Sequence, residues 1–322
     1  MNRTAKGLIC LVVVSYVTSL PAYSGVSETG GTDSFARLQY VVNGFKPDVK
    51  FRTPTSLAVD QANNLVYVCD SEDKKISAFS LQGVGKFRIG EKGELDDPLG
   101  VAVDRRGKLY VSERRLRKIR VFDTGNRLEA EIDLSGIAES PKVQPGKIVV
   151  SRSGNLYVVD QANQQILVFD KDRNLKLKFG KIGDRQGEFR TIEDVTVDRQ
   201  DRIYVADSSG FPVEVFDKSG GYISRIGLRG EANGLVDPVA VTVDRFDQLW
   251  VVDSSEHNIR IYDRIGLQLK MFGEYGMGET MLFYPVDMDI DEMGRVYILE
   301  RGSNRMQVFE LESPNQPIPR PR

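Results

Sequence analysis

The stretch that decides the fold is Asp104-Arg105-Arg106-Gly107-Lys108-Leu109-Tyr110-Val111-Ser112-Glu113. Variants of this pattern occur six times along the chain, and each is followed by an apolar segment that ends in Val-Phe-Asp or a close variant. The acidic residue that closes the pattern recurs in steps of 43, 47, 47, 46 and 47 residues, at Asp70, Glu113, Asp160, Asp207, Asp253 and Glu300. A period of about 40–50 residues built from short strands is typical of β-propeller blades.

Each repeat predicts four short strands. An Asp ends the first strand in five of the six repeats and favours a tight turn, the second strand carries Leu-Tyr-Val, and the third carries Ile-x-Val-Phe. Four strands of this kind form one twisted antiparallel sheet, which cannot bury both of its apolar faces alone. The sequence therefore predicts an all-β fold, a six-bladed β-propeller of four-stranded antiparallel blades.

The sequence also predicts how the ring closes. After Phe309 and Glu310 the chain has only a Pro-containing stretch, which cannot supply a fourth strand to the last blade. Residues 37–44 match the fourth-strand pattern, so we expect them to complete the blade formed by residues 286–310. The expected organisation is a signal peptide (1–24), a flexible linker (25–36), the propeller (37–310) and a Pro-rich disordered tail (311–322).

The first residues indicate export. Arg3 and Lys6 precede a short apolar run, and small residues follow it at the spacing of a cleavage site. We expect a periplasmic or extracellular protein, without a stable membrane span after cleavage, because a spanning helix needs about 20 apolar residues. Without that segment 42 basic and 46 acidic residues remain, a mild acidity that argues against nucleic-acid binding. Cys69 is then the single thiol, so no intrachain disulfide is expected.

Two stretches resemble the NHL-repeat family of six-bladed propellers: Asp253-Ser254-Ser255-Glu256-His257-Asn258-Ile259-Arg260-Ile261-Tyr262-Asp263 and Ser303-Asn304-Arg305-Met306-Gln307-Val308-Phe309. The resemblance extends over residues 37–310 and implies a fold rather than an activity. Members of the family are adaptors and receptors as often as enzymes. One related group, the amidating lyases, uses histidine-bound zinc. That chemistry is not implied here, because His257 is the only histidine and a catalytic zinc usually takes three protein ligands.

Strand alternation predicts which side chains of the inner strands point into the central channel. Most of them are small or neutral, and the charged exceptions are Lys147, Asp194, Asp287 and Asp289. On one interpretation the three carboxylates, Asp194, Asp287 and Asp289, bind calcium, which favours carboxylate and carbonyl oxygens. On the other, Lys147 pairs with Asp194 across adjacent blades and water solvates Asp287 and Asp289, so that no cofactor is present. The repeated acid at the end of the second strand is expected to stabilise a turn.

Two loop features suggest contacts with a partner. The basic run that contains Arg114, Arg115 and Arg117 could attract an acidic partner, or could be a solvated face balanced by neighbouring acids. The loop 275–284 carries Phe283 and Tyr284 beside two methionines, an excess of large apolar side chains. Such a cluster is typical of a protein contact or of a small satellite core under a loop.

No nucleophile elbow, phosphate-binding loop, zinc spacing or haem-attachment motif is present in the sequence. The leading hypothesis is therefore an exported, non-catalytic binding or scaffold propeller that engages a protein or a surface polymer through loops at one channel mouth. The alternative is a calcium-dependent hydrolase or lactonase-like enzyme with its site in the central channel.

Overall fold

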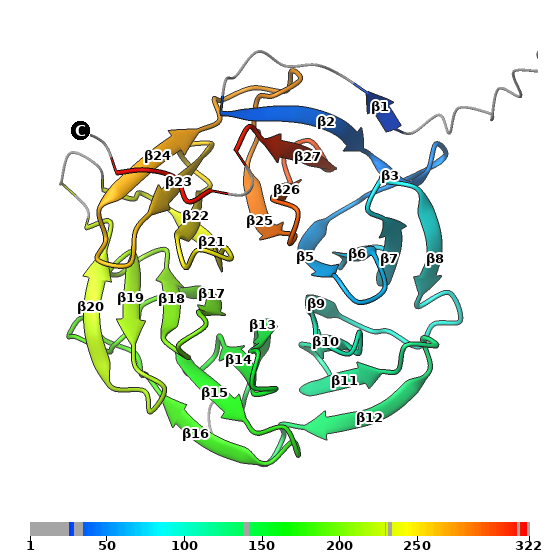
Figure 1. Cartoon of the computed structure of the whole chain (residues 1–322). Coiled ribbons are helices and arrows are strands. Elements are labelled where there is room, and N and C mark those ends of the chain that lie inside the picture. The colour runs from blue at the N-terminus through cyan, green and yellow to red at the C-terminus, as the bar shows by residue number, and fades with distance from the viewer. Residues whose placement is uncertain are drawn as a thin grey trace, which may run out of the picture.

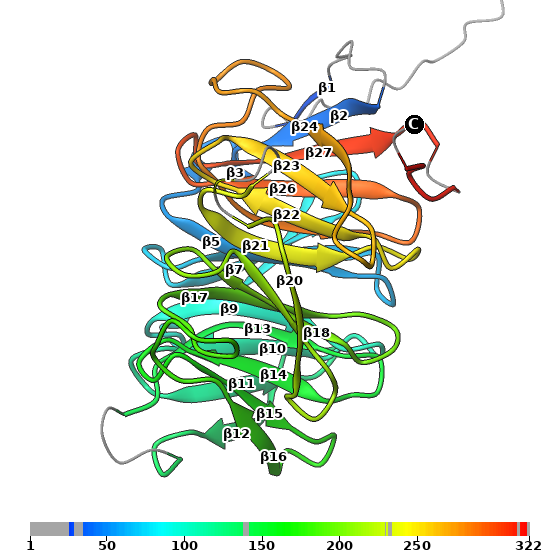
Figure 2. The same cartoon turned by 90° about the vertical axis from the view of Figure 1, so that its left-hand side faces the viewer.

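The structure is a computed structural model that describes residues 26–28, 35–137, 142–228, 230, 234–313 and 316–320; the expected signal peptide lies outside this range. All regular secondary structure in these residues is β-strand. Six sheets of four or five strands stand around a central channel (Figure 1), and Figure 2 shows the ring from the side. The expected six-bladed propeller is confirmed. The described part of the chain contains no helix of the length and hydropathy that a membrane span requires.

The first five blades each consist of four consecutive antiparallel strands, with the first strand at the channel. Blade one comprises β5 (Pro54–Asp60), β6 (Leu65–Asp70), β7 (Lys75–Ser80) and β8 (Gly85–Ile89). Blade two comprises β9 (Pro98–Val103), β10 (Leu109–Glu113), β11 (Lys118–Phe122) and β12 (Leu128–Asp133). Blade three comprises β13 (Pro145–Val150), β14 (Leu156–Asp160), β15 (Gln165–Phe169) and β16 (Leu175–Phe179). Blade four comprises β17 (Ile192–Val197), β18 (Ile203–Asp207), β19 (Val213–Phe216) and β20 (Tyr222–Ile226). Blade five comprises β21 (Pro238–Val243), β22 (Leu249–Asp253), β23 (Asn258–Tyr262) and β24 (Gln268–Phe272).

Blade six closes the ring with strands from both ends of the chain. It combines β25 (Pro285–Ile290), β26 (Arg295–Glu300) and β27 (Arg305–Leu311) with β2 (Ala36–Val42), which pairs antiparallel with β27. The closing strand expected at residues 37–44 is therefore confirmed. A further strand, β1 (Val26–Glu28), pairs with the outer edge of β2, inside the segment expected to be a linker. A small hairpin of β3 (Gly44–Lys46) and β4 (Val49–Lys50) leads from β2 to blade one.

The hydrophobic core lies between neighbouring blades rather than at a single centre. Tyr204 and Val213 of blade four, for example, share a buried cluster with Val241 and Val251 of blade five. Similar clusters join the other neighbouring blades. Because each blade buries its faces against two others, the closure at blade six completes the core of the ring as well as its outline.

The repeated acids stabilise loops, as expected from their uniform repetition. Asp207 accepts hydrogen bonds from the backbone N–H groups of Arg190 and Thr191, both at 2.9 Å. Asp253 accepts the corresponding pair from Val236 and Asp237. Each acid thus ties the second strand of its blade to the loop that precedes the inner strand, which makes the loops at this end of the channel a rigid set.

The tail differs from the sequence-based expectation of disorder over residues 311–322. β27 extends to Leu311, and residues 316–320 lie against blade five. There the backbone of Ile318 exchanges two hydrogen bonds with the side chain of Gln248. The prolines of the tail favour an extended chain, but their pattern gives no sign of the surface that receives it.

Candidate functional site

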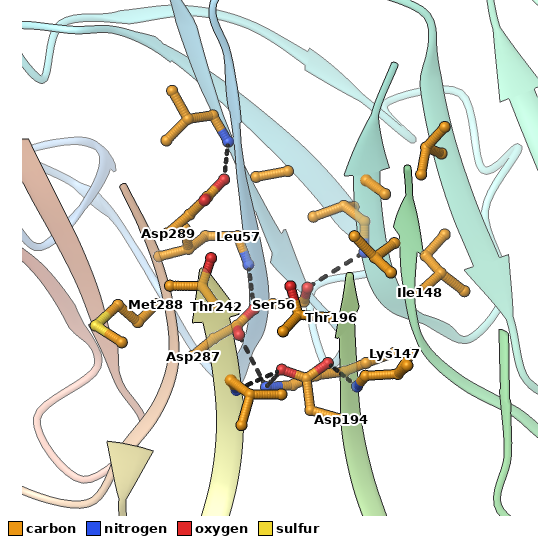
Figure 3. A pocket seen from close by; sticks show the side chains of 18 of the residues that line it. Ser56, Leu57, Lys147, Ile148, Asp194, Thr196, Thr242, Asp287, Met288 and Asp289 are labelled. Carbon is orange, nitrogen blue, oxygen red and sulfur yellow. Dashed lines mark hydrogen bonds and ion pairs between the residues drawn. The ribbon is translucent and has the colours of Figure 1, made fainter. Parts of the chain in front are cut away.

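One end of the channel opens into a cavity of about 300 Å³, which we call the mouth. It lies where the inner strands begin and the second strands end. Its polar lining comes from blade one and blades three to six: Thr55, Lys147, Gln161, Glu193, Asp237, Ser254, Tyr284 and Arg301. Deeper in the channel lies a second cavity of about 230 Å³, the channel cavity, lined by all six inner strands (Figure 3). Lys147 lines both cavities, so its side chain forms the boundary between them.

Lys147 crosses the channel from blade three. Its ammonium group donates to the carbonyl oxygens of Val239 in blade five (3.1 Å) and Val286 in blade six (2.7 Å) and to Oδ1 of Asp287 (2.9 Å). Asp194 Oδ2 lies 3.8 Å away. Burial opposes the charged ammonium, but the carboxylates of Asp287 and Asp194 outweigh it and raise the pKa of Lys147. The lysine is therefore a fixed positive charge that joins four blades.

Asp194 and Asp287 each bind the inner strand of the next blade. Asp194 accepts from the N–H of Val241 in blade five at 2.9 Å, and Asp287 accepts from the N–H of Leu57 in blade one at 2.7 Å (Figure 3). Burial raises the pKa of Asp194 to about 7, against the opposing charge of Lys147. These carboxylates satisfy backbone donors on the channel-facing edges of the inner strands, which have no neighbouring strand on that side.

Asp289 makes the same kind of contact at the seam where the ring closes. Its Oδ2 accepts from the N–H of Val59 in blade one (2.8 Å) and its Oδ1 from the N–H of Ile290 (2.8 Å). Burial raises the pKa of Asp289 to about 6. Asp287 and Asp289 together therefore join blade six to blade one across the closure seam, a role that neither sequence-based interpretation anticipated. Lys147 lies closer to Asp287 than to Asp194, the partner expected from adjacency.

The arrangement does not fit a calcium ion. Each oxygen of Asp194, Asp287 and Asp289 already accepts a hydrogen bond from a backbone N–H or from Lys147. The ammonium of Lys147 occupies the position between Asp194 and Asp287 that a cation would take. Over the described residues, no group of three or more His, Cys, Asp and Glu side chains is arranged to hold a metal ion. Calcium binding by these residues stays a prediction without geometric support.

The basic run lies outside the mouth and is largely paired. Arg114 donates to Asp97 at 2.9 Å, and Arg115 pairs with Asp96. Arg117 is exposed, in a left-handed turn with φ 53°. The predicted balance by acidic neighbours is present: Asp97 and Asp96 pair with Arg114 and Arg115. Further along the same run, Glu131 and Glu113 pair with Lys118 and Arg120. None of these arginines lines the mouth cavity.

The loop 275–284 and His257 of blade five together form an aromatic group, which consists of His257, Tyr275, Phe283 and Tyr284. The ring centroids of His257 lie 4.8 Å from Tyr275 and 4.7 Å from Tyr284, and Phe283 packs 5.0 Å from Tyr284. Tyr275 is 67% exposed and Tyr284 is 43% exposed. The cluster is thus internally packed, as a satellite core would be, and still presents two tyrosine faces to solvent beside the mouth.

Arg305 stabilises the backbone of the loop 275–284. Its guanidinium donates to the carbonyl oxygens of Met277, Gly278 and Met281 at 2.8–3.2 Å, while Glu300 pairs with it at 2.7 Å. Leu282 is fully buried and anchors the same segment. The exposed side chains of the loop therefore stand on a supported backbone, which reduces the entropy lost on binding.

Tyr284 is held in a left-handed backbone conformation, with φ 48°. The equivalent residues of the other five blades, all within the described ranges, have no such conformation: Thr53, Asp97, Gln144, Thr191 and Asp237. A left-handed non-glycine residue costs about 1–2 kcal/mol. The N–H of Tyr284 donates to Nδ1 of His257 at 3.0 Å and its carbonyl accepts from the N–H of Arg301 at 3.0 Å, so its surroundings maintain the strain. Strain of this kind is concentrated at functional positions.

Glu193 and Arg301 are mouth residues that the sequence analysis missed. Glu193 accepts from Ser208 at 3.1 Å, and burial raises its pKa, with the charge of Asp237 acting in the same direction. The signal was present in the repeat, because the positions equivalent to Glu193 carry Thr55, Leu99, Gly146, Val239 and Val286. The mouth therefore combines two carboxylates, a guanidinium and the half-exposed Tyr284, a set suited to polar groups on a partner surface.

Comparison with known proteins supports the fold assignment. A model of the NHL repeat matches residues 51–79, and a model described as a 6-bladed beta-propeller matches residues 132–210. The resemblance to NHL-repeat propellers is thereby confirmed. No curated protein matches the sequence.

Solved structures share the architecture at low sequence identity. Virginiamycin B lyase from Staphylococcus aureus is 13% identical with a TM-score of 0.61, over 86% of this chain and 99% of that one. A gluconolactonase from Xanthomonas campestris is 15% identical with a TM-score of 0.61, over 89% and 99%. A protein of unknown function from Bacteroides thetaiotaomicron is 17% identical with a TM-score of 0.67, over 84% and 72%. Likenesses at these identities concern the fold alone.

Proposed function

We propose that this six-bladed propeller is an exported, non-catalytic binding protein that engages a protein or a surface polymer through its mouth. The observation that carries the proposal is Tyr284, a half-exposed aromatic residue kept in a strained conformation at the rim of the cavity. Selection for stability alone would favour a glycine or asparagine at this φ. A tyrosine at this position is explained by contact of its side chain with a partner, because tyrosine supplies a large contact area and loses little conformational entropy on binding.

The floor of the mouth supports binding at the surface rather than passage through the ring. Lys147, with its contacts to Val239, Val286 and Asp287, closes the mouth from the channel cavity. A partner would therefore rest on the rim, over Glu193, Arg301 and the aromatic group. The acidic and basic groups of the rim provide polar anchors around a tyrosine centre, the usual organisation of a protein contact.

The proposal is tested by measuring how much partner is captured by the wild type, by a variant of the mouth and by a control variant. The mature protein is immobilised and exposed to envelope extract, and the captured material is identified by mass spectrometry and carbohydrate analysis. The variant Tyr275→Ser/Tyr284→Ser should reduce capture of the identified partner at least tenfold. The control Ile265→Ser changes a residue that is 77% exposed in the turn after β23, at the end of the ring away from the mouth, and should leave capture unchanged. Equal capture by both variants would refute the proposal.

A calcium-dependent hydrolase or lactonase-like enzyme is the second candidate. It is compatible with the shared fold of the gluconolactonase. The half-buried Glu193, which lines the mouth together with Asp237, could serve as an acid or base there. The two candidates are separated by calorimetry with calcium on the wild type and Asp289→Asn, together with lactone hydrolysis assays. Heat that disappears in the variant, accompanied by turnover, would favour the enzyme over the binding protein.

A further inference from the structure

Blade five differs from blades four and six in the turn after its inner strand. In blades four and six an arginine at this turn pairs with the aspartate four residues earlier, Arg202 with Asp198 at 2.6 Å and Arg295 with Asp291 at 2.5 Å. Blade five has Gln248 at this position. Its side-chain amide is therefore available for a partner outside the turn, at the end of the ring opposite the mouth.

A second difference, this time from blades two and three, lies in the turn between the third and fourth strands. The aspartate of this turn pairs with the residue four positions later in blade two, Asp123 with Arg127, and in blade three, Asp170 with Asn174. In blade five Asp263 is followed at that distance by Leu267, which offers no polar group. Its Oδ1 accepts from two backbone N–H groups of the turn, which leaves Oδ2 for another partner.

Residues 316–320, Gln-Pro-Ile-Pro-Arg, engage both positions. The side chain of Gln248 donates to the carbonyl of Ile318 at 2.8 Å and accepts from its N–H at 3.0 Å, which reproduces one β-bridge. Arg320 pairs with Oδ2 of Asp263 at 2.8 Å. The side chain of Ile318 packs against the buried cluster that contains Trp250. The segment is thus recognised through its backbone, one apolar side chain and one charge.

The sequence of the segment suits this recognition. Pro317 and Pro319 have no N–H and favour an extended backbone, so the N–H of Ile318 is the one donor among these three residues. The side-chain oxygen of Gln248 accepts a hydrogen bond from that N–H. Because prolines restrict the free segment, docking orders fewer conformations than docking of an ordinary loop would. Figure 1 shows the segment in red, beside β23 and β24.

We propose that blade five carries a receptor groove for an extended Pro-x-Pro-Arg segment and that residues 316–320 of the same chain are its occupant. The segment and the blade five residues Phe246, Gln248, Leu269 and Lys270 together line a cavity of about 470 Å³. Phe35, just before β2, also lines it and stacks on Trp250 with a centroid separation of 6.3 Å. The docked segment therefore fastens the start of the closing strand to blade five.

Hydrogen exchange on the full chain tests the occupant. The Ile318 amide should exchange at least tenfold more slowly than in a synthetic peptide of residues 313–322. Gln248→Ala should bring its rate within twofold of the peptide, and Asp263→Asn should accelerate it several-fold. Asp217→Asn, the same turn substitution in blade four, should leave it unchanged. Exchange at the peptide rate in the wild type would overturn the proposal. If the protection of the Ile318 amide rises with protein concentration, the segment docks on a second copy of the chain. That result would overturn the proposal that the segment occupies the groove of its own chain.

Competition in trans tests the recognition chemistry. The full chain with Ile318→Asp and Arg320→Glu should release its own segment and bind the labelled wild-type peptide at least tenfold more tightly than the wild-type protein does, measured by fluorescence anisotropy. A peptide with Arg320→Glu should bind at least tenfold more weakly than the wild-type peptide. Absence of peptide binding by the released variant, or equal binding of both peptides, would contradict the proposed groove. Neither result would affect the function proposed for the mouth.

Discussion

Lys147 Nζ lies 2.9 Å from Asp287 Oδ1, although the two residues belong to inner strands of blades three and six. The contact passes across the channel and ends beside the carbonyl oxygens of Val239 and Val286. It braces opposite sides of the ring and closes the floor of the mouth. The channel acids therefore act as a brace: Asp194 and Asp287 face the ammonium of Lys147, and Asp289 accepts hydrogen bonds from backbone N–H groups.

Removal of the ammonium should destabilise the ring. Lys147→Met leaves the buried carboxylates of Asp287 and Asp194 without their cation, which typically costs about 3–5 kcal/mol. Urea unfolding should report this loss. The control Lys118→Met breaks a more exposed pair with Glu131 at 2.6 Å and should cost about 0–1 kcal/mol. Equal losses in the two variants would contradict the brace.

The ring closure should be visible in thermal melting. Deletion of residues 25–45 removes β2 and leaves β27 and the core of blade six exposed. The melting temperature should fall sharply, because the buried faces on both sides of the seam lose their partner. Differential scanning calorimetry provides the measurement, and an unchanged melting temperature would refute the closure.

Asp289 should contribute to stability in a defined pH window. Burial raises its pKa to about 6 from an ordinary 3.8, so the folded state holds a proton that the unfolded state has lost between these values. The contribution is complete below about pH 4 and is lost as the pH rises through 6. The stability advantage of the wild type over Asp289→Asn should therefore shrink from pH 4 to pH 7, as measured by urea unfolding.

Asp123 provides a control of opposite sign for this pH dependence. Its pKa is lowered by hydrogen bonds from the backbone and side chain of Arg127. It should contribute stability above its ordinary pKa and lose that contribution as the pH falls. A pH profile for Asp289→Asn that parallels the profile for Asp123→Asn would contradict the assignment.

Substitution of Tyr284 should weaken binding without lowering the stability of the protein. Tyr284→Gly removes a side chain that is 43% exposed and relieves the left-handed backbone, so the melting temperature should stay unchanged or rise. Binding of the partner should weaken at least tenfold. A variant that loses stability in proportion to binding would indicate that the tyrosine is a packing residue.

The repeat was sufficient to predict the fold. The steps near 46 residues predict the blades, and the missing fourth strand after Phe309 predicts the closure. Alternation correctly placed Lys147, Asp194, Asp287 and Asp289 along the channel. These inferences succeed because a residue's place in a strand fixes the direction of its side chain.

The contacts of those residues could not be predicted from the sequence. Strand alternation gives the direction of a side chain but not the group that it contacts. The hydrogen bond from the N–H of Val59 to Asp289 therefore does not follow from the sequence. The backbone conformation of Tyr284 depends on His257 in the neighbouring blade. The docked segment at Gln248 joins residues 70 positions apart. Each of these features depends on distances between blades, which a repeat pattern does not encode.

Site-specific photocrosslinking tests the central claim, that the mouth is the binding face, most directly. A photoreactive phenylalanine analogue replaces Tyr275 beside the mouth, or Ile223 on the outer strand β20, 49% exposed, as the control. After irradiation of the exported protein in its native envelope, position 275 should give a discrete adduct and position 223 should give none. Adducts from position 223 with none from position 275 would contradict the proposed binding face.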